Sequence, residues 1–400
     1  MGKNSIKYKN SRSIVLKNEM INGVKFNDIP FFNGDKGFAV VYLSGEFHLF
    51  FPYSTLMKGW VMHYVSTDGF AWEQKEVAVF VKKPVDSVAA YVQNGKIYLY
   101  YLTYNIFGKT DLNLTVSKDG ENFLPFPSAL IKNTALRDIK CFYSGGTRYL
   151  VGSEIKGDLI PTYLSLDGVE WVKSGLAHLV SEQSEVTYLG APSPFVAYDR
   201  SYVAYSMCGA HIAEADYDLS ANTVKVGELV QSFEGGVVRS TMVGEGNPLL
   251  FVGVGSALVT AECYFSEKGI GFRLYREILK GARLLVDKGV EKGKTQPTEW
   301  LHESDIYHIF SLPFKSGVSL TVGDLVIKVG ESGELTIGNE EIYPECDTLE
   351  LSLLDEGGLV VVEVCDKVYP VLTDALGTIK LSGTEDFSHE CYRIRGNYEL

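Results

Sequence analysis

One pattern recurs along the chain at intervals of about 50 residues. Three segments read Ser-x-Asp-Gly and reach Trp or Phe three residues after the Gly, with the Asp at positions 68, 119 and 167. Two weaker copies place a turn near positions 218 and 268, so successive turns lie 51, 48, 51 and 50 residues apart by subtraction. An Asp-Gly turn between alternating apolar residues is a strong hairpin signal, because Gly supplies the positive φ that the turn requires.

A second series of hairpin signals falls between these turns. Its members are centred on Gly45, Gly95, Gly146, Arg200 and Asn247. Two hairpins per period make four short strands per unit, and five such units predict a five-bladed β-propeller over residues 30 to 280. A β-sandwich with coincidental spacing is the alternative, and the even intervals favour the propeller.

The composition of the sequence changes after the last repeat. Residues 273–302 are rich in Lys and Arg and predict a connector, which we place at 281–305. Alternating apolar residues return over 306–400, which predicts a β-sandwich. The 24 Tyr, 21 Phe and 40 Gly of the chain favour strands and turns over helices. We therefore expect an all-β protein with a propeller domain at 1–280, the connector, and a sandwich domain at 306–400.

Charge and hydropathy exclude several classes of partner. The chain has 37 basic against 50 acidic residues, a net charge of -13, so attraction to a phosphate backbone cannot drive nucleic-acid binding. No apolar run is long enough for a membrane helix, and the first residues lack the apolar core of a secretion signal, so we expect a cytoplasmic protein. No close set of His or Cys ligands indicates a metal, and no cofactor is expected. The sequence is compatible with a homo-oligomer and does not determine the oligomeric state.

Three carboxylates share one position of the repeat. Asp35, Asp86 and Asp138 each lie eight to ten residues before a hairpin Gly, with spacings of 51 and 52. The first strand of every propeller blade lines the central axis, so these side chains are predicted to converge. Each Asp alone could be a solvated turn residue. As a set, neighbouring carboxylates raise one another's pKa, which supplies the ionised and the protonated carboxyl that glycoside cleavage needs.

Several motifs resemble glycoside hydrolase family 32, the invertases, levanases and inulinases. The clearest is Leu136-Arg137-Asp138-Ile139-Lys140-Cys141-Phe142, and GEFHLFFPY at 45–53 adds to the likeness. The resemblance implies a five-bladed propeller followed by a β-sandwich, and a small carbohydrate substrate such as a β-fructoside. It also implies that Asp138 holds the fructosyl hydroxyls and that Arg137 orients Asp138.

The family's nucleophile motif, Asn-Asp-Pro-Asn-Gly, is altered in this chain. The best match is Asn33-Gly34-Asp35-Lys36-Gly37, which implies that Asp35 is the nucleophile. Asn27-Asp28-Ile29-Pro30 is an alternative match to the motif. An ungapped count back from His48 would instead place Lys36 at the position of the nucleophile.

The family's general acid is absent from its expected place. Where the family has Glu-Cys-Pro-Asp, this chain reads Gly190-Ala191-Pro192-Ser193, and Gly190 cannot donate a proton. Loss of a general acid typically removes about 10²- to 10⁴-fold of rate when the leaving group is poor. A displaced acid could be Asp86, Glu185 or Glu182, and the repeat position favours Asp86.

These observations support a glycoside hydrolase of family 32 type with an atypical acid. The alternatives are a sugar-binding propeller without turnover, and a related propeller glycosidase or phosphorylase in which Arg137 or Lys36 binds phosphate. Trp60 and Tyr188 could stack on a sugar ring, although aromatic residues more often pack in a core. The predicted catalytic residues are Asp35, Asp138 and Asp86, and the predicted substrate-binding residues are Arg137, Ser87, Trp60, His63 and Tyr188.

Overall fold

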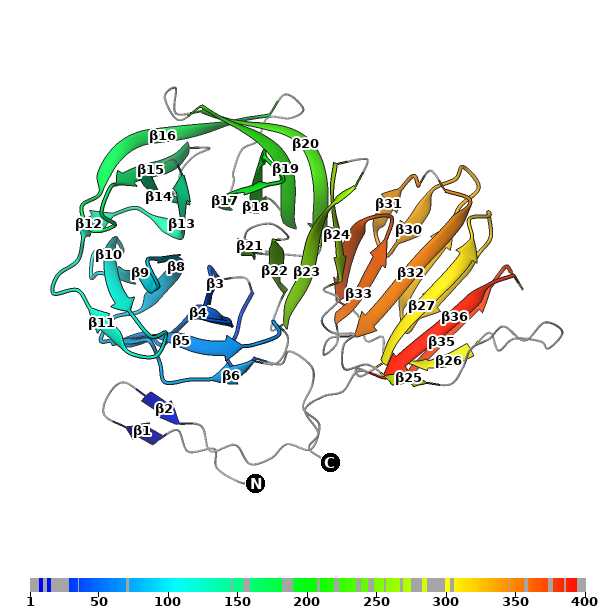
Figure 1. Cartoon of the computed structure of the whole chain (residues 1–400), viewed down its shortest axis with the longest axis horizontal. Coiled ribbons are helices and arrows are strands. Elements are labelled where there is room, and N and C mark those ends of the chain that lie inside the picture. Colours follow the sequence, from blue (N-terminus) through cyan, green and yellow to red (C-terminus); the bar gives the residue numbers. More distant parts are fainter. Residues whose placement is uncertain are drawn as a thin grey trace. The chain divides into compact units, whose positions relative to one another are not determined.

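The computed structural model contains strands and no helix in the part of the chain that it describes (Figure 1). The described residues are 7–9, 13–15, 29–34, 36–69, 72–144, 147–153, 159–181, 190–206, 209–218, 223–234, 239–243, 248–254, 257–266, 269–274, 283–285, 299–302, 306–344, 346–355, 359–372, 377–384 and 386–393. The prediction of an all-β protein is confirmed. None of the described elements is a helix that could cross a membrane.

Most strands of the first 274 residues form antiparallel sheets made from consecutive strands. After a short pair, β1 and β2, the sheets follow the order β3-β4-β5-β6 with β7 beside β5, β8-β9-β10-β11 with β12 beside β10, and β21-β22-β23-β24. Between them, β13 to β16 and β17 to β20 are joined into one sheet, because β16 and β20 pair in parallel. The bounds are β1 Lys7–Lys9, β2 Ser13–Val15, β3 Ala39–Leu43, β4 Glu46–Ser54, β5 Gly59–Ser66, β6 Glu73–Gln74, β7 Val79–Val81, β8 Val85–Gln93, β9 Lys96–Tyr104, β10 Thr110–Ser117, β11 Phe123–Pro125, β12 Ile131–Thr134, β13 Arg137–Ser144, β14 Thr147–Ser153, β15 Leu159–Ser165, β16 Val172–Ser181, β17 Gly190–Ala197, β18 Arg200–Ser206, β19 Gly209–Asp218, β20 Thr223–Glu234, β21 Arg239–Val243, β22 Leu249–Val254, β23 Ala257–Ser266 and β24 Gly269–Leu274.

The first strands of the successive four-strand groups contact one another in a closed cycle. β3 contacts β8, β8 contacts β13, β13 contacts β17, β17 contacts β21, and β21 contacts β3. Figure 1 shows these five strands nearest the centre of the group of sheets. Residues near the start of these inner strands, although about 50 positions apart in sequence, are therefore brought together.

The repeated Ser-x-Asp-Gly segments form closely similar turns. In each one the Gly amide donates to the Ser hydroxyl, at 2.8 Å for Gly69, 2.9 Å for Gly120 and 2.8 Å for Gly168. The Ser hydroxyl in turn donates to the Asp carboxylate two residues on. The three Gly residues have φ between 77° and 78°, which favours Gly over any residue with a Cβ. The turn that the repeat predicted is therefore a local structure stabilised by its own side chains.

Alternating residues of each strand pack against different neighbouring sheets. In β9, Ile97, Leu99 and Tyr101 join a buried cluster with residues of β3, β4 and β5. Tyr100 and Leu102 point the other way and join a cluster with residues of β13, β14 and β15. Because side chains alternate across a strand, a strand buried on both faces reads as the continuous apolar run KIYLYYL.

The later strands belong to a second compact unit, which contains Val259–Leu400. Two six-stranded sheets, β25-β36-β27-β32-β33-β34 and β26-β35-β28-β29-β30-β31, contribute to one buried apolar cluster. The bounds are β25 Arg283–Leu285, β26 Glu299–His302, β27 Ile306–Pro313, β28 Ser319–Val322, β29 Leu325–Val329, β30 Leu335–Ile337, β31 Glu340–Ile342, β32 Thr348–Asp355, β33 Leu359–Val364, β34 Lys367–Leu372, β35 Gly377–Ser382 and β36 Ser388–Arg393.

Candidate active site

Three of the inner strands carry a β-bulge near their first residue. The register with the following strand shifts between Val85 and Val88 in β8, between Arg137 and Lys140 in β13, and between Gly190 and Ser193 in β17. A bulge leaves an extra residue unpaired and changes the direction of its side chain. When the three register shifts are aligned, Asp86, Asp138 and Ala191 occupy equivalent positions. Gly190 is then equivalent to Arg137.

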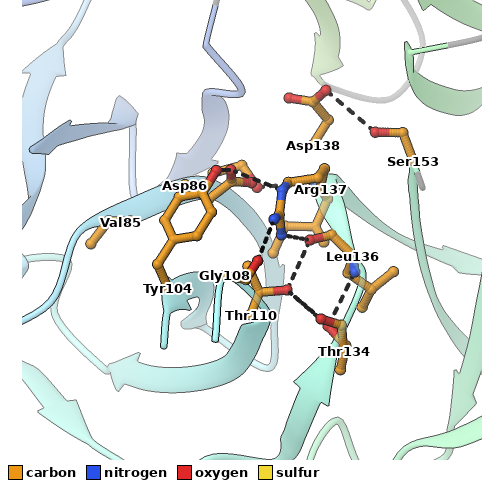
Figure 2. A network of polar contacts seen from close by, with 12 residues as sticks. Val85, Asp86, Tyr104, Gly108, Thr110, Thr134, Leu136, Arg137, Asp138 and Ser153 are labelled. Atoms are coloured by element: carbon orange, nitrogen blue, oxygen red, sulfur yellow. Dashed lines mark hydrogen bonds and ion pairs between the residues drawn. The ribbon is translucent and has the colours of Figure 1, made fainter. Parts of the chain in front are cut away.

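Asp86 lies in a mostly buried polar network between β8, β9 and β13 (Figure 2). Its Oδ1 atom accepts a hydrogen bond of 2.5 Å from the Tyr104 hydroxyl and lies 3.7 Å from Nε of Arg137. Burial raises the pKa of the Asp86 carboxyl above its ordinary value. The Tyr104 hydrogen bond and the Arg137 charge lower this pKa in part, and the negative charge of Asp138 raises it further. Asp86 therefore keeps a proton to a higher pH than an exposed aspartate.

The Arg137 guanidinium is fixed by several partners. It donates to the carbonyl oxygens of Leu136, at 2.9 Å, and Gly108, at 3.0 Å. Its central carbon lies 4.6 Å from the centroid of the Tyr104 ring. We expected Arg137 to orient Asp138, and the ion pair that it forms is with Asp86. The planar guanidinium suits this place, because several donors can be satisfied at once.

Asp138 lies in the β13 bulge and has a left-handed backbone conformation, with φ at 46°. This conformation is costly for a residue other than Gly, and such residues are found mainly where function or packing demands them. The Asp138 carboxylate is 3.4 Å from the Ser153 hydroxyl on the adjacent strand β14. Figure 2 shows the Asp138 side chain above Arg137, with its dashed line running to Ser153.

The segment that follows Asp35 contacts the same two bulges. A Cβ atom built on Gly37 would lie 3.0 Å from Cβ of Ser87 and 3.7 Å from Oδ1 of Asp138. The buried Lys140 ammonium donates to the Phe38 carbonyl at 2.9 Å. Asp35 itself lies outside the described residues, but the chain two positions after it runs directly beside Asp138.

The other predicted site residues have different surroundings. Ser87 is fully buried, and its hydroxyl accepts a hydrogen bond of 3.3 Å from the Ile139 amide, which links the bulges of β8 and β13. Trp60 packs between the rings of Tyr53 and Phe80.

His63 forms a buried pair with His48, with 3.0 Å between ring nitrogens. Burial lowers the pKa of His63 to about 3, so this ring is neutral at ordinary pH. Lys36 is exposed. Tyr188, Glu182 and Glu185 lie outside the described residues. Among the described residues, no three His, Cys, Asp or Glu side chains are placed to hold a metal ion.

Sequence reasoning missed Tyr104. This residue ends β9, in a run that contains four other Tyr residues from Tyr91 to Tyr101, and nothing in that run distinguishes it. The only useful signal is its place directly before the hairpin between β9 and β10, at the end of the sheet where β8 begins. Recognising that signal requires the strand register, in which Thr103 pairs with Val85.

Residues 32–226 match the model of the glycosyl hydrolases family 32 N-terminal domain. Solved structures resemble the chain over nearly its whole length, although their sequence identity is low. A sucrose-6-phosphate hydrolase from Lactobacillus gasseri has a TM-score of 0.72 at 12% identity, with 93% of each chain covered. A fructan 1-exohydrolase from Cichorium intybus has a TM-score of 0.69 at 10% identity, with 93% of this chain and 97% of that chain covered.

A β-fructofuranosidase from Bombyx mori has a TM-score of 0.68 at 17% identity, with 90% of each chain covered. No curated protein matches the sequence. The chain thus has the fold of these solved structures. The resemblance to glycoside hydrolase family 32 is confirmed.

Proposed function

We propose that this protein is a glycoside hydrolase of family 32 type that acts on β-fructosides or related small glycosides, with Asp86 as its general acid. The proposal includes a five-bladed β-propeller over residues 1–280, a connector at 281–305 and a β-sandwich at 306–400. The closed cycle of inner strands supports the propeller, and the buried cluster shared by the two later sheets supports the β-sandwich. The segment 281–305 also contributes β25 and β26 to those sheets, where they pair with β36 and β35. We propose a cytoplasmic enzyme that needs no metal.

The environment of Asp86 is the observation that carries the proposal. A general acid must hold its proton near the working pH, and burial raises the pKa of Asp86 in the required direction. Tyr104 and Arg137 both approach Oδ1, so we assign the transferable proton to Oδ2. The names of the similar structures include a sucrose-6-phosphate hydrolase and a β-fructofuranosidase, which supports a fructoside as the substrate.

The remaining roles follow from the family resemblance and from the contacts around Asp138. Asp35 would attack the anomeric carbon, and Asp138 would accept hydrogen bonds from the sugar hydroxyls. The leaving oxygen would take the Asp86 proton, and Asp86 would then accept a proton from the water that releases the sugar. The contacts of Gly37 and Phe38 with β13 support an Asp35 close to Asp138.

Hydrolysis of sucrose, sucrose 6-phosphate and a short fructan by the native chain and by single Asp→Asn variants tests this proposal. We expect Asp86→Asn to lower kcat by about 10²- to 10⁴-fold, and Asp35→Asn and Asp138→Asn to abolish turnover. Asp199→Asn is the matched control, because Asp199 is exposed in the β17–β18 hairpin and Asn tolerates its positive φ. Unchanged activity in Asp86→Asn would refute the role of Asp86.

A sugar-binding protein without turnover is the alternative, and Gly190 is the residue that favours it. Sucrose binding by a folded chain that releases no sugar from any fructoside would establish this alternative. A phosphorylase receives less support, because the Arg137 guanidinium already contacts Leu136, Gly108 and Asp86.

A further inference from the structure

The hairpin between β9 and β10 is tied directly to the proposed acid. Its first residue, Tyr104, donates to Asp86, and the carbonyl of Gly108 accepts from Arg137, whose Nε lies 3.7 Å from Asp86. Figure 2 shows Tyr104 and Gly108 beside the Arg137 guanidinium, with the contact to Gly108 drawn as a dashed line. A group bound at Asp86 therefore lies beside this hairpin.

The hairpin is held in one conformation by Asn105. The Asn105 side chain accepts hydrogen bonds from the amides of Phe107, at 3.0 Å, and Lys109, at 3.1 Å. It also donates to the Asn133 side chain at 2.9 Å. The backbone adds a bond of 2.8 Å from the Asn105 amide to the Lys109 carbonyl. Side chains at the tip are thus carried on an ordered turn, which reduces the entropy lost when they bind a ligand.

This ordered tip exposes two large apolar side chains. Ile106 is 92% exposed and Phe107 is 77% exposed. Phe107 precedes Gly108, the residue whose carbonyl holds Arg137, so it is only a few bonds from the network.

The hairpin between β4 and β5 repeats this arrangement on the other side of β8. Its base contacts Val85, the residue before Asp86: the Ser54 hydroxyl accepts from the Val85 amide at 2.8 Å and donates to its carbonyl at 3.0 Å. Its tip exposes Leu56, at 92%, and Met57, at 74%. Scattered apolar residues on a surface are ordinary, but two apolar pairs on the two hairpins that hold residues 85 and 86 form a localised feature.

We infer that the preferred substrate is a glycoside of an apolar aromatic alcohol, and that Ile106, Phe107, Leu56 and Met57 bind this leaving group. The inference rests on the proposed function, because the group that receives a proton from Asp86 must lie against it. An aryl group gains from contact with the apolar side chains at the two hairpin tips, and the hydroxyls of a sugar do not.

The chemistry of such a leaving group is compatible with Asp86 as the acid. A phenolic oxygen leaves as a weak base, with a pKa near that of Tyr, about 10, and needs less protonation than a sugar alkoxide. The bond between the anomeric carbon and the phenolic oxygen breaks, the electron pair stays on that oxygen, and Asp86 supplies its proton. Water then releases the sugar and returns a proton to Asp86, so the products are the free sugar and the phenol.

The test compares methyl, benzyl and phenyl β-fructosides as substrates of the full chain. Methanol and benzyl alcohol are both weak acids, so the ratio of kcat/KM for the benzyl fructoside to that for the methyl fructoside measures the contribution of apolar binding. The phenyl fructoside adds the effect of a more acidic leaving group. We expect benzyl to exceed methyl by roughly tenfold. Phe107→Ser and Ile106→Asn should lower benzyl and phenyl turnover by roughly tenfold and leave methyl turnover nearly unchanged.

Leu166→Asn is the control, since Leu166 is 79% exposed in a different turn. Equal kcat/KM for the methyl and benzyl fructosides would overturn the inference, and so would Phe107→Ser and Ile106→Asn variants that lower both values equally. The proposed function would still stand in either case if turnover depended on Asp86. Absence of turnover with every fructoside in a folded chain would refute the proposed function and the inference with it.

Discussion

The second and fourth inner strands bend in the same place but carry different chemistry. β8 and β17 both have a bulge one residue after their start, at Asp86–Ser87 and Ala191–Pro192. In β8 the bulge presents a carboxylate with a hydroxyl and a guanidinium as partners. In β17 the residues Gly190, Ala191 and Pro192 contain no group that can transfer a proton. The backbone feature that directs a side chain is thus present without the side chain that would use it.

This difference separates the position of an acid from the environment that makes it one. A bulge fixes where a side chain points, but burial and charged neighbours set its pKa. Asp86 has both, because β9 and β13 supply Tyr104 and Arg137. Substitutions in the two strands can therefore test whether β8 performs the acid chemistry that β17 lacks.

The largest effect is expected when a carboxylate is returned to β17. In an Asp86→Asn background, Gly190→Glu should recover at least about tenfold of the lost kcat on sucrose, because a Glu at the start of β17 stands where the family resemblance places the acid. Steady-state kinetics of the double variant against Asp86→Asn measure the recovery.

The control is Gly190→Gln in the same background, which adds the same bulk without a proton to donate. Equal rates for the Glu and Gln variants would show that β17 is not positioned for acid catalysis.

The sequence allowed much of this arrangement to be predicted, because its signals are local or periodic. The Ser-x-Asp-Gly turns are stabilised by bonds within four residues, so they can be recognised without knowledge of the rest of the fold. The spacing of Asp86 and Asp138 follows the period of the sheets, and the structure places both in equivalent bulges.

The partners of Asp86 were beyond sequence reasoning because they depend on tertiary contacts. Arg137 was assigned to its neighbour Asp138, yet its ion pair is with a residue 51 positions earlier. Tyr104 donates across two strands of one sheet, and its role depends on a register that composition does not determine. Burial of Trp60 by Tyr53 and Phe80 is likewise a packing outcome.

Removal of the Tyr104 hydroxyl should give the next largest effect. The Tyr104 hydrogen bond lowers the pKa of Asp86, so Tyr104→Phe should raise that pKa. A general acid works while protonated, so the alkaline limb of the kcat/KM profile should move to higher pH. Tyr98→Phe, on the same strand, is the control. An unchanged or lower limb in Tyr104→Phe would contradict the assignment of Asp86 as the acid.

Loss of the Arg137 charge should act in the same direction and more weakly. The positive charge favours ionised Asp86, so Arg137→Met should shift the alkaline limb of the kcat/KM profile to higher pH. The difference between the native chain and Arg137→Met should shrink as salt is added. Salt screens the attraction between Arg137 and Asp86 in the native chain, because the pair is not fully buried. Arg200→Met, in an exposed pair with Glu214, should leave the profile unchanged. A downward shift in Arg137→Met would show that Asp86 is not the group observed.

The smallest effect is expected from a carboxylate placed in the β17 bulge itself. Ala191 aligns with Asp86, so Ala191→Asp in the Asp86→Asn background reproduces the position of the acid without its partners. The residue before it is Gly190, where β13 has Arg137, so no guanidinium comes from the equivalent place. We expect kcat on sucrose to stay within about threefold of the Asp86→Asn value, measured beside Gly190→Glu.

Recovery by Ala191→Asp equal to that by Gly190→Glu would mean that the bulge alone makes an acid of any carboxylate that it presents. In that case the contacts of Asp86 with Tyr104 and Arg137 would adjust its pKa without being needed for its role. A recovery confined to Gly190→Glu would instead show that an acid at this end of the strands depends on which residue of the bulge carries it, and that β8 acts through Asp86 because its neighbours complete the site there.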